Sequence, residues 1–255
     1  MIGAIAGDIV GSRFEHHPHK SVEFELWHPD CRFTDDTVMT IATAEALLTD
    51  RDFGAAYHRW GNRYPDAGYG RAFRTWLATL DPVPYDSWGN GSAMRVSPVA
   101  WVAGSEAQVL DLARETALPT HGHERGIIGA QAVALATWLA GHERDAAEIR
   151  EKVAGISGYD LDRTVAEIRT TYAFDVSCDG SVPEAIICGL EATSWEHAVR
   201  LAVSLGGDAD TQAAIAGGIA SFRFAEAHEL WWKLGAYLPE EMMRVLQIYT
   251  RKQSW

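Results

Sequence analysis

Two acidic segments, far apart in the chain, each begin an apolar stretch. The first reads FTDDTVMTIATAEALL and spans residues 33–48, and the second reads LGGDADTQAAIAGGIA and spans residues 205–220. In both, carboxylate and hydroxyl side chains stand where a helix presents its unpaired N–H groups and the positive end of its dipole. One side-chain oxygen is enough to cap a helix. Capping alone is one interpretation, and the surplus of oxygen donors favours another.

That other interpretation is a metal site. Together the segments offer four carboxylates and two hydroxyls, on Thr34, Asp35, Asp36, Asp208, Asp210 and Thr211. Such oxygen donors suit Mg²⁺ or Mn²⁺, or Ca²⁺, whereas zinc favours nitrogen and sulfur. Four carboxylates match two ions about 3.5–4 Å apart better than one ion. Without cations they would repel one another and raise their own pKa values. Neither segment has the glycine and the loop spacing of an EF-hand.

The composition is that of an ordinary globular protein. Of the 255 residues, 47% are hydrophobic and 22% charged, enough to bury a core in a single domain spanning residues 1–255. The formal net charge of −13 argues against a broad nucleic-acid-binding surface and against binding to anionic membranes, although local groups can still hold a small anionic ligand. The three cysteines form no CxxC pair, and the N-terminus is a poor signal peptide. The apolar run at 127–140 is too short for a membrane span, so we expect a cytoplasmic protein.

Helical periodicity dominates the sequence. The helical patterns cover residues 37–48, 108–118, 125–140, 145–153, 161–171, 195–205, 211–222 and 239–249. Glycine and proline cluster between them in RYPDAGYG, LDPVPYDSWGNGS, LPTHGHERG and SCDGSVPEA, which we expect to be loops. Strand-like alternation occurs only briefly, in SVEFELW. The sequence therefore lacks the several strands that a parallel sheet needs. The sequence predicts an all-α fold, a single compact multi-helix orthogonal bundle with a binuclear metal site at helix N-termini and loops.

Six motifs follow one another along nearly the whole chain: GDIVGSRFE, FTDDTVMT, YGRAF, SWGNGSAMRVSPVAW, THGHERGIIGA and LGGDADTQAAIAGGIA. This ordered series resembles the ADP-ribosylglycohydrolase family, the relatives of dinitrogenase reductase-activating glycohydrolase. The resemblance implies an all-α bundle with a binuclear Mg²⁺ or Mn²⁺ centre, in agreement with the donor set above. It also implies removal of ADP-ribose from modified targets. The partners would be ADP-ribose and an ADP-ribosylated protein, nucleic acid or small molecule.

Position by position, the resemblance assigns roles to the motif residues. It makes the six oxygen donors the metal ligands, with Asp35 and Asp36 also counted as catalytic. Glu15 closes GDIVGSRFE, whose two glycines permit close backbone approach, and matches a catalytic carboxylate beside the reacting ribose. His121 in THGH matches a contact near the adenosine side. The part that lies along the diphosphate and distal ribose corresponds to Gly89, Asn90, Gly91, Ser92, Met94 and Arg95.

The second acidic segment departs from the common family pattern at two positions. Ala209 stands where a threonine is usual, and Gln212 stands where asparagine is frequent. All six presumed ligands are present, so the departures bear on substrate choice and not on metal binding. Two other functions stay open: a two-metal hydrolase of another glycosidic or phosphorylated small molecule, and a non-catalytic ADP-ribose-binding module.

Other polar residues have simpler interpretations. Asp8 is expected to be structural and to hold the GDIVGS turn by hydrogen bonds. Asp66 in YPDAGYG is a candidate substrate-side acid. The run HHPH at 16–19 offers nitrogen ligands, but Pro18 breaks any helical face and disfavours a zinc or nickel site. Backbone N–H groups at 89–92 can point at phosphate oxygens, and Arg95 can add positive charge.

Overall fold

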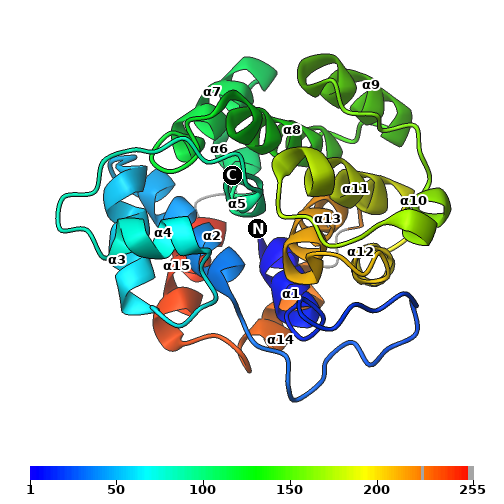
Figure 1. Ribbon diagram of the computed structural model, residues 1–255, viewed down its shortest axis with the longest axis horizontal. Coiled ribbons are helices and arrows are strands. Elements are labelled where there is room, and N and C mark those ends of the chain that lie inside the picture. The colour runs from blue at the N-terminus through cyan, green and yellow to red at the C-terminus, as the bar shows by residue number, and fades with distance from the viewer. Residues whose placement is uncertain (225–226, 252–255) are drawn as a thin grey trace.

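The computed structural model describes residues 1–224 and 227–251, and these residues form a multi-helix bundle (Figure 1). In chain order its helices are α1 (Ile2–Gly11), α2 (Asp35–Leu48), α3 (Phe53–Arg63), α4 (Arg71–Leu77), α5 (Gly91–Met94), α6 (Val99–Val102), α7 (Glu106–Ala117), α8 (Glu124–Gly141), α9 (Ala146–Ser157), α10 (Val165–Thr171), α11 (Cys178–Glu191), α12 (Trp195–Val203), α13 (Ala209–Arg223), α14 (Ala227–Leu234) and α15 (Glu240–Arg251). Two isolated β-bridges accompany them and no sheet forms among the described residues. The all-α prediction is confirmed.

Helices α1 and α13 pack directly against each other inside the bundle (Figure 1). Every residue of α1 is buried, and so is nearly all of α13. Gly3, Gly7 and Gly11 recur at four-residue spacing along α1, and a Cβ added at any of them would overlap a backbone carbonyl oxygen of α13. Missing side chains therefore allow the two backbones to approach closely. The GDIVGS glycines serve this contact from within a helix, whereas the sequence analysis placed them in a turn.

Periodicity predicted eight helices that the structure confirms, with ends that differ by a few residues: α2, α7, α8, α9, α10, α12, α13 and α15. The loop predicted at SCDGSVPEA is wrong, because α11 begins at Cys178 and runs on through Pro183. Ser177 caps this helix by accepting a hydrogen bond from the Gly180 N–H at 3.0 Å. Since nearly all of α11 is buried, packing outweighs the low helix propensity of glycine and proline.

The segment SVEFELW forms no strand in the structure. It belongs to an irregular connection between α1 and α2 that covers residues 12–34. The guanidinium of Arg200 on α12 donates to the carbonyl oxygens of Val22 and Phe24, both at 2.8 Å. These bonds satisfy backbone groups that a partner strand would otherwise take. None of the described helices is long and apolar enough to cross a bilayer.

We expect Gly7→Ala to destabilise the protein, because the added methyl group would overlap the Ala213 carbonyl oxygen on α13. Overpacking of this kind costs about 1–3 kcal/mol of unfolding free energy. Gly155→Ala on α9 is the matched control, since nothing lies within 4 Å of an added Cβ there. That control should be neutral or stabilising by up to about 1 kcal/mol. Urea unfolding measures both, and a Gly7→Ala protein as stable as the wild type would refute the close helix contact.

Candidate metal centre and active-site cavity

The two acidic helix starts meet at one cavity. Its volume is about 300 Å³, and five of the six predicted oxygen donors line it: Asp35, Asp36, Asp208, Asp210 and Thr211. These donors come from the first turns of α2 and α13. Asp36 and Thr211, for example, are 175 residues apart in the chain. The Thr211 hydroxyl donates to Asp36 Oδ2 at 3.2 Å and so joins the two segments directly. A common binding site for both segments therefore exists in the fold.

Asp8 holds the start of α2 in this place. The side chain, fully buried on α1, accepts hydrogen bonds from the backbone N–H of Thr34 and of Thr37, both at 3.0 Å. It also accepts from the hydroxyl of Thr34 at 2.6 Å and from the hydroxyl of Thr37. The Thr34 oxygen in turn accepts from the Asp36 N–H and caps α2. The structural role predicted for Asp8 is therefore larger than a local turn, because this residue ties α1 to α2.

Burial raises the pKa of each carboxyl group at the cavity. For Asp35 and Asp36 the next cause is the negative charge of Asp8, and for Asp210 it is the charge of Asp208. Asp208 has a raised pKa too, although a hydrogen bond from the Asn90 amide at 2.6 Å works against the effect of burial. Ionised carboxylates at this density are unfavourable unless positive charge lies close by.

A divalent cation fits this donor set. Asp36 Oδ1 is buried and has no hydrogen-bond partner, so a bound ion would supply what it lacks. Glu15, Asp208 and Asp210 each present an oxygen, and these atoms lie within 4.8 Å of one another. Carboxylate oxygens of this kind are the ligands that Mg²⁺ and Mn²⁺ favour. Glu15 is thus a candidate ligand as well as the candidate catalytic residue.

Glu15 reaches the cavity from the irregular segment that follows α1. Farther along the segment, Lys20 Nζ donates to three carbonyl oxygens at the C-terminal ends of α10 and α12. The lysine side chain also comes within 2.9 Å of the point where a Cβ of Gly206 would be, and Gly206 has a φ of 68° that favours glycine. The segment with Glu15 is therefore fastened next to the turn that precedes Asp208.

The histidines of HHPH do not form a metal site with one another. His16 is exposed and its Nε2 lies 3.7 Å from Glu15 Oε2, while the ring of His19 packs against Phe14 with centroids 5.1 Å apart. Among the described residues, no group of metal-binding side chains includes these histidines.

The loop before α5 contributes Gly89 and Asn90 to the cavity, and the first residue of α5 contributes Gly91. Its backbone pairs with the segment before α11: Asn90 N–H donates to Val176 O at 2.8 Å, and Cys178 N–H donates to Trp88 O at 3.0 Å. The Cys178 thiol adds a bond to Gly89 O at 3.0 Å. The loop is thus fixed by the N-terminal end of α11, which the sequence analysis had not recognised as a helix.

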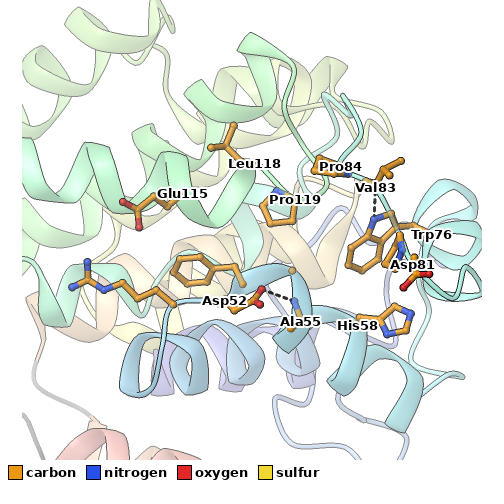
Figure 2. Close-up of a pocket in the computed structure, with 14 residues that line it drawn as sticks. Asp52, Ala55, His58, Trp76, Asp81, Val83, Pro84, Glu115, Leu118 and Pro119 are labelled. Carbon is orange, nitrogen blue, oxygen red and sulfur yellow. Dashed lines mark hydrogen bonds between the residues drawn. The ribbon is translucent and has the colours of Figure 1, made fainter.

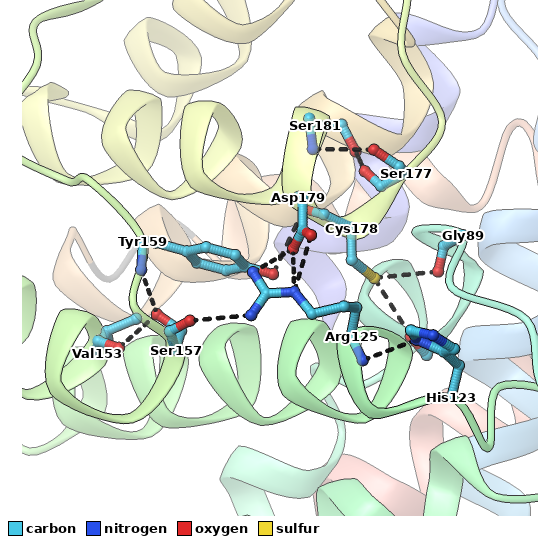
Figure 3. A network of polar contacts seen from close by, with 12 residues as sticks. Gly89, His123, Arg125, Val153, Ser157, Tyr159, Ser177, Cys178, Asp179 and Ser181 are labelled. Carbon is cyan, nitrogen blue, oxygen red and sulfur yellow. Dashed lines mark hydrogen bonds and ion pairs between the residues drawn. The ribbon is translucent and has the colours of Figure 1, made fainter.

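Figure 3 shows how this end of α11 is fixed in turn. Arg125 on α8 donates through Nε to both carboxylate oxygens of Asp179, at 2.7 and 2.8 Å. Its guanidinium carbon lies 5.6 Å from the ring centre of Tyr159, whose hydroxyl donates to Cys178 O at 3.4 Å. This network joins α8 and α11 behind the loop.

Arg95 and His121 also line the cavity. The Arg95 guanidinium lies over the Tyr57 ring at 4.0 Å and donates to Thr116 O at 2.9 Å and to Thr120 Oγ1 at 2.8 Å. Arg95 Nε is buried without a partner. Burial and the nearby Arg95 charge lower the pKa of His121 well below its usual value, so this imidazole is neutral at pH 7. A positive group and a neutral nitrogen ring thus face the same space.

The remaining predicted site residues lie elsewhere, except Met94, which lines the cavity. Ser92 is buried and donates to Gly126 O at 2.7 Å, so it connects α5 to α8. Asp66 is exposed and is not among the residues that line the cavity. The hydroxyl of Thr34 is directed to Asp8.

Sequence reasoning did not single out several residues that do line the cavity, among them Tyr69, Arg71, Phe73, Tyr85 and Val176. The first three belong to the motif YGRAF, which was noted without an assigned role. Val176 belongs to no motif, and no spacing or composition signal marks it. Its place follows from the pairing of its backbone with Asn90.

A second, larger cavity of about 840 Å³ lies between α3 and the segments before α5 and after α7 (Figure 2). Its acidic residues, Asp52, Asp81 and Glu115, are exposed and do not gather into a metal-binding group. Asp52 accepts from the Ala55 N–H at 2.9 Å and caps α3. Size alone does not make this cavity the active site, because the convergent polar groups lie in the smaller one.

Fold and site define a class of all-helical proteins in which two helix N-termini bring carboxylates to one cavity. A family model for ADP-ribosylglycohydrolase matches residues 1–236, and the chain belongs to this family. ADP-ribosylhydrolase ARH3 of Mus musculus is 29% identical over 91% of this chain and 85% of its own, and ARH3 of Homo sapiens is 29% identical over 86% and 83%. A solved structure described as an ADP-ribosylglycohydrolase-related protein complex has a TM-score of 0.67 and 26% identity, over 99% of this chain and 94% of that one. The resemblance found in the motifs is confirmed, and these relatives support a hydrolase of this type.

The raised carboxyl pKa values predict how stability depends on pH without metal. A carboxyl group with a folded-state pKa above its unfolded value of about 4 contributes stability below that value and loses it as the pH rises through the folded-state pKa. We therefore expect the unfolding free energy of metal-free protein to fall as the pH rises above about 5. Mg²⁺ or Mn²⁺ should restore part of the loss. Asp210→Asn should flatten the pH dependence, and an unchanged slope in that variant would contradict this account.

Thr37→Val should destabilise the protein by about 1–3 kcal/mol, because it removes a donor to the buried Asp8 carboxylate while conserving side-chain shape. Thr75→Val on α4 is the control, since Thr75 is exposed and its hydroxyl bonds only locally, to Arg71 O. The control should change stability by less than about 0.5 kcal/mol. Urea unfolding in the presence of chelator compares the two, and equal losses would show that the bond to Asp8 has no special weight.

Proposed function

We propose that the chain is a metal-dependent ADP-ribosyl hydrolase. It cleaves the glycosidic bond between the distal ribose of ADP-ribose and a nitrogen- or oxygen-linked acceptor, and it releases ADP-ribose. The observation that carries this proposal is the convergence of Glu15 with the carboxylates of two helix starts in one cavity. The family and the ARH3 relatives support the same type of reaction.

The lining residues offer complementary groups for the parts of this substrate. Arg95 provides the positive charge for the diphosphate, and its unpartnered Nε has a donor available for a phosphate oxygen. The Gly91 N–H in the first turn of α5 can add a neutral donor, whereas the N–H groups of Gly89 and Asn90 already donate to Ser87 Oγ and Val176 O. His121, kept neutral by burial and by Arg95, suits the uncharged adenosine better than a second phosphate.

Two divalent cations, held by the carboxylates, would supply the positive charge that orients the ribose hydroxyls and lowers the pKa of a water molecule. Cleavage passes through an oxocarbenium-like state that carries positive charge on the sugar, and the carboxylates at the cavity favour such charge. Glu15 takes the proton of the attacking water or gives a proton to the leaving group. Its pKa is raised, first by burial, which brings it closer to the neutral range where either transfer is efficient.

The test is to incubate the purified protein with arginine-linked and serine-linked ADP-ribosyl peptides and to follow free ADP-ribose by chromatography. Each reaction is run with Mg²⁺, with Mn²⁺ and with chelator. Metal-dependent release from one linkage supports the proposal and identifies the bond. ADP-ribose binding without release favours the non-catalytic module. With neither release nor binding, the two-metal hydrolase of another small molecule becomes the better explanation.

Substitutions should separate metal binding from proton transfer. Asp36→Asn and Asp210→Asn should lower metal affinity by at least about 10-fold and turnover with it. Glu15→Gln should lower turnover by about 10²–10⁴-fold with a smaller change in metal affinity. Calorimetric titration with Mn²⁺ and single-turnover rates give the two numbers for each variant. Full turnover in Glu15→Gln, or a metal affinity reduced as far as in Asp210→Asn, would overturn its assignment as the proton-transfer group.

A further inference from the structure

Tyr69 presents a buried hydroxyl that nothing in the described structure satisfies. The residue lies in the loop between α3 and α4, is 3% exposed and lines the candidate active-site cavity. Its ring packs against Phe73 of α4, with centroids 5.1 Å apart. The hydroxyl oxygen is buried and has no hydrogen-bond partner. A buried donor without a partner destabilises the protein by about 1–3 kcal/mol. A ligand that offers an acceptor to this hydroxyl would remove that cost.

The loop places Tyr69 beside the acidic part of the cavity. Ala67 O accepts a hydrogen bond from the Asp35 N–H at 2.8 Å, so the loop is fixed to the first residue of α2. A Cβ added at Gly68 would lie 3.3 Å from Asp35 Oδ1. Tyr69 follows directly in the chain. A phenol has an ordinary pKa of about 10, so the group is protonated at neutral pH and can act as a donor.

The chemistry of the site limits what this donor can meet. Asp35 and its neighbouring carboxylates belong to the part of the cavity assigned to the ions and the reacting sugar, whereas Arg95 offers charge for the diphosphate. An uncharged phenol donor next to carboxylates suits an uncharged acceptor such as a sugar hydroxyl. We propose that the Tyr69 hydroxyl donates a hydrogen bond to a hydroxyl oxygen of the distal ribose, an assignment that rests on the proposed ADP-ribosyl substrate. Tyr69 thereby selects nucleoside diphosphates that carry this second sugar.

Tyr69→Phe removes the hydroxyl and keeps the ring that packs on Phe73. Calorimetric titration in Mg²⁺ with ADP-ribose, and with ADP, which lacks the distal ribose, measures the contact. We expect ADP-ribose affinity to fall by about 5–10-fold and ADP affinity to stay the same. Tyr85→Phe is the matched control from the same cavity, next to His121, and should leave the ratio of the two affinities unchanged.

Unfolding in the absence of nucleotide gives a second readout. Because the hydroxyl has no partner in the protein, Tyr69→Phe should leave the unfolding midpoint equal or raise it, whereas loss of a structural hydrogen bond would lower it. Equal weakening of ADP-ribose and ADP, no weakening of either, or a lowered midpoint would each overturn the assignment. If the wild type binds ADP but gains nothing from the distal ribose, the inference fails. If the wild type binds neither nucleotide, the proposed function fails as well. Nucleotide binding by the wild type therefore separates failure of the inference from failure of the proposed function.

Discussion

The whole site depends on one buried carboxylate. Asp8 on α1 accepts hydrogen bonds from the backbone and the hydroxyls of Thr34 and Thr37, so the first turn of α2 is held against α1. Since α1 also packs its glycine face on α13, the same short helix fixes the first turns of both acidic helices. Carboxylates from the two segments are therefore held close together. Asp36 and Asp208, for example, are 172 residues apart in the chain and line the same cavity. Their proximity is imposed by packing that lies behind the cavity, and not by attraction between them.

Imposed proximity has an electrostatic consequence. Carboxyl groups held together in a buried place have raised pKa values, because burial and mutual repulsion both disfavour the charged form. The free energy for this arrangement comes from the packed helices around it. Divalent cations would offset the negative charge of these carboxylates. The Asp36 oxygen that has no hydrogen-bond partner is available to such a cation. Structure and charge thus explain why a rigid all-helical scaffold suits a metal centre: helix packing places the candidate ligands close together.

Eight of the fifteen described helices could be predicted because their buried faces repeat with the helical period. The prediction missed seven of the described helices: α1, α3, α4, α5, α6, α11 and α14. At α1 and α11 the reason is that Gly7, Gly11, Gly180 and Pro183 resemble turn residues. Those residues are unfavourable in an isolated helix, but in α1 the glycines allow close contact with α13 and in α11 burial compensates. At these two buried helices, local propensity gave the wrong answer because contacts with neighbouring helices decide the conformation. The same residues could not be read correctly without knowing what packs against them.

For the candidate site, the sequence by itself determined the types of donor and their positions at helix starts, because capping chemistry and oxygen ligands are local properties of short segments. It also determined the family, through the order of six motifs. Tertiary structure decided which of these side chains face the cavity: Ser92 turns to α8, Asp66 stays at the surface, and Tyr69 and Val176 enter. The physical reason is that orientation is set by contacts between segments far apart in the chain, such as Asp35 with Ala67 and Asn90 with Val176. A linear pattern records which groups are present, but only packing fixes the directions in which they point.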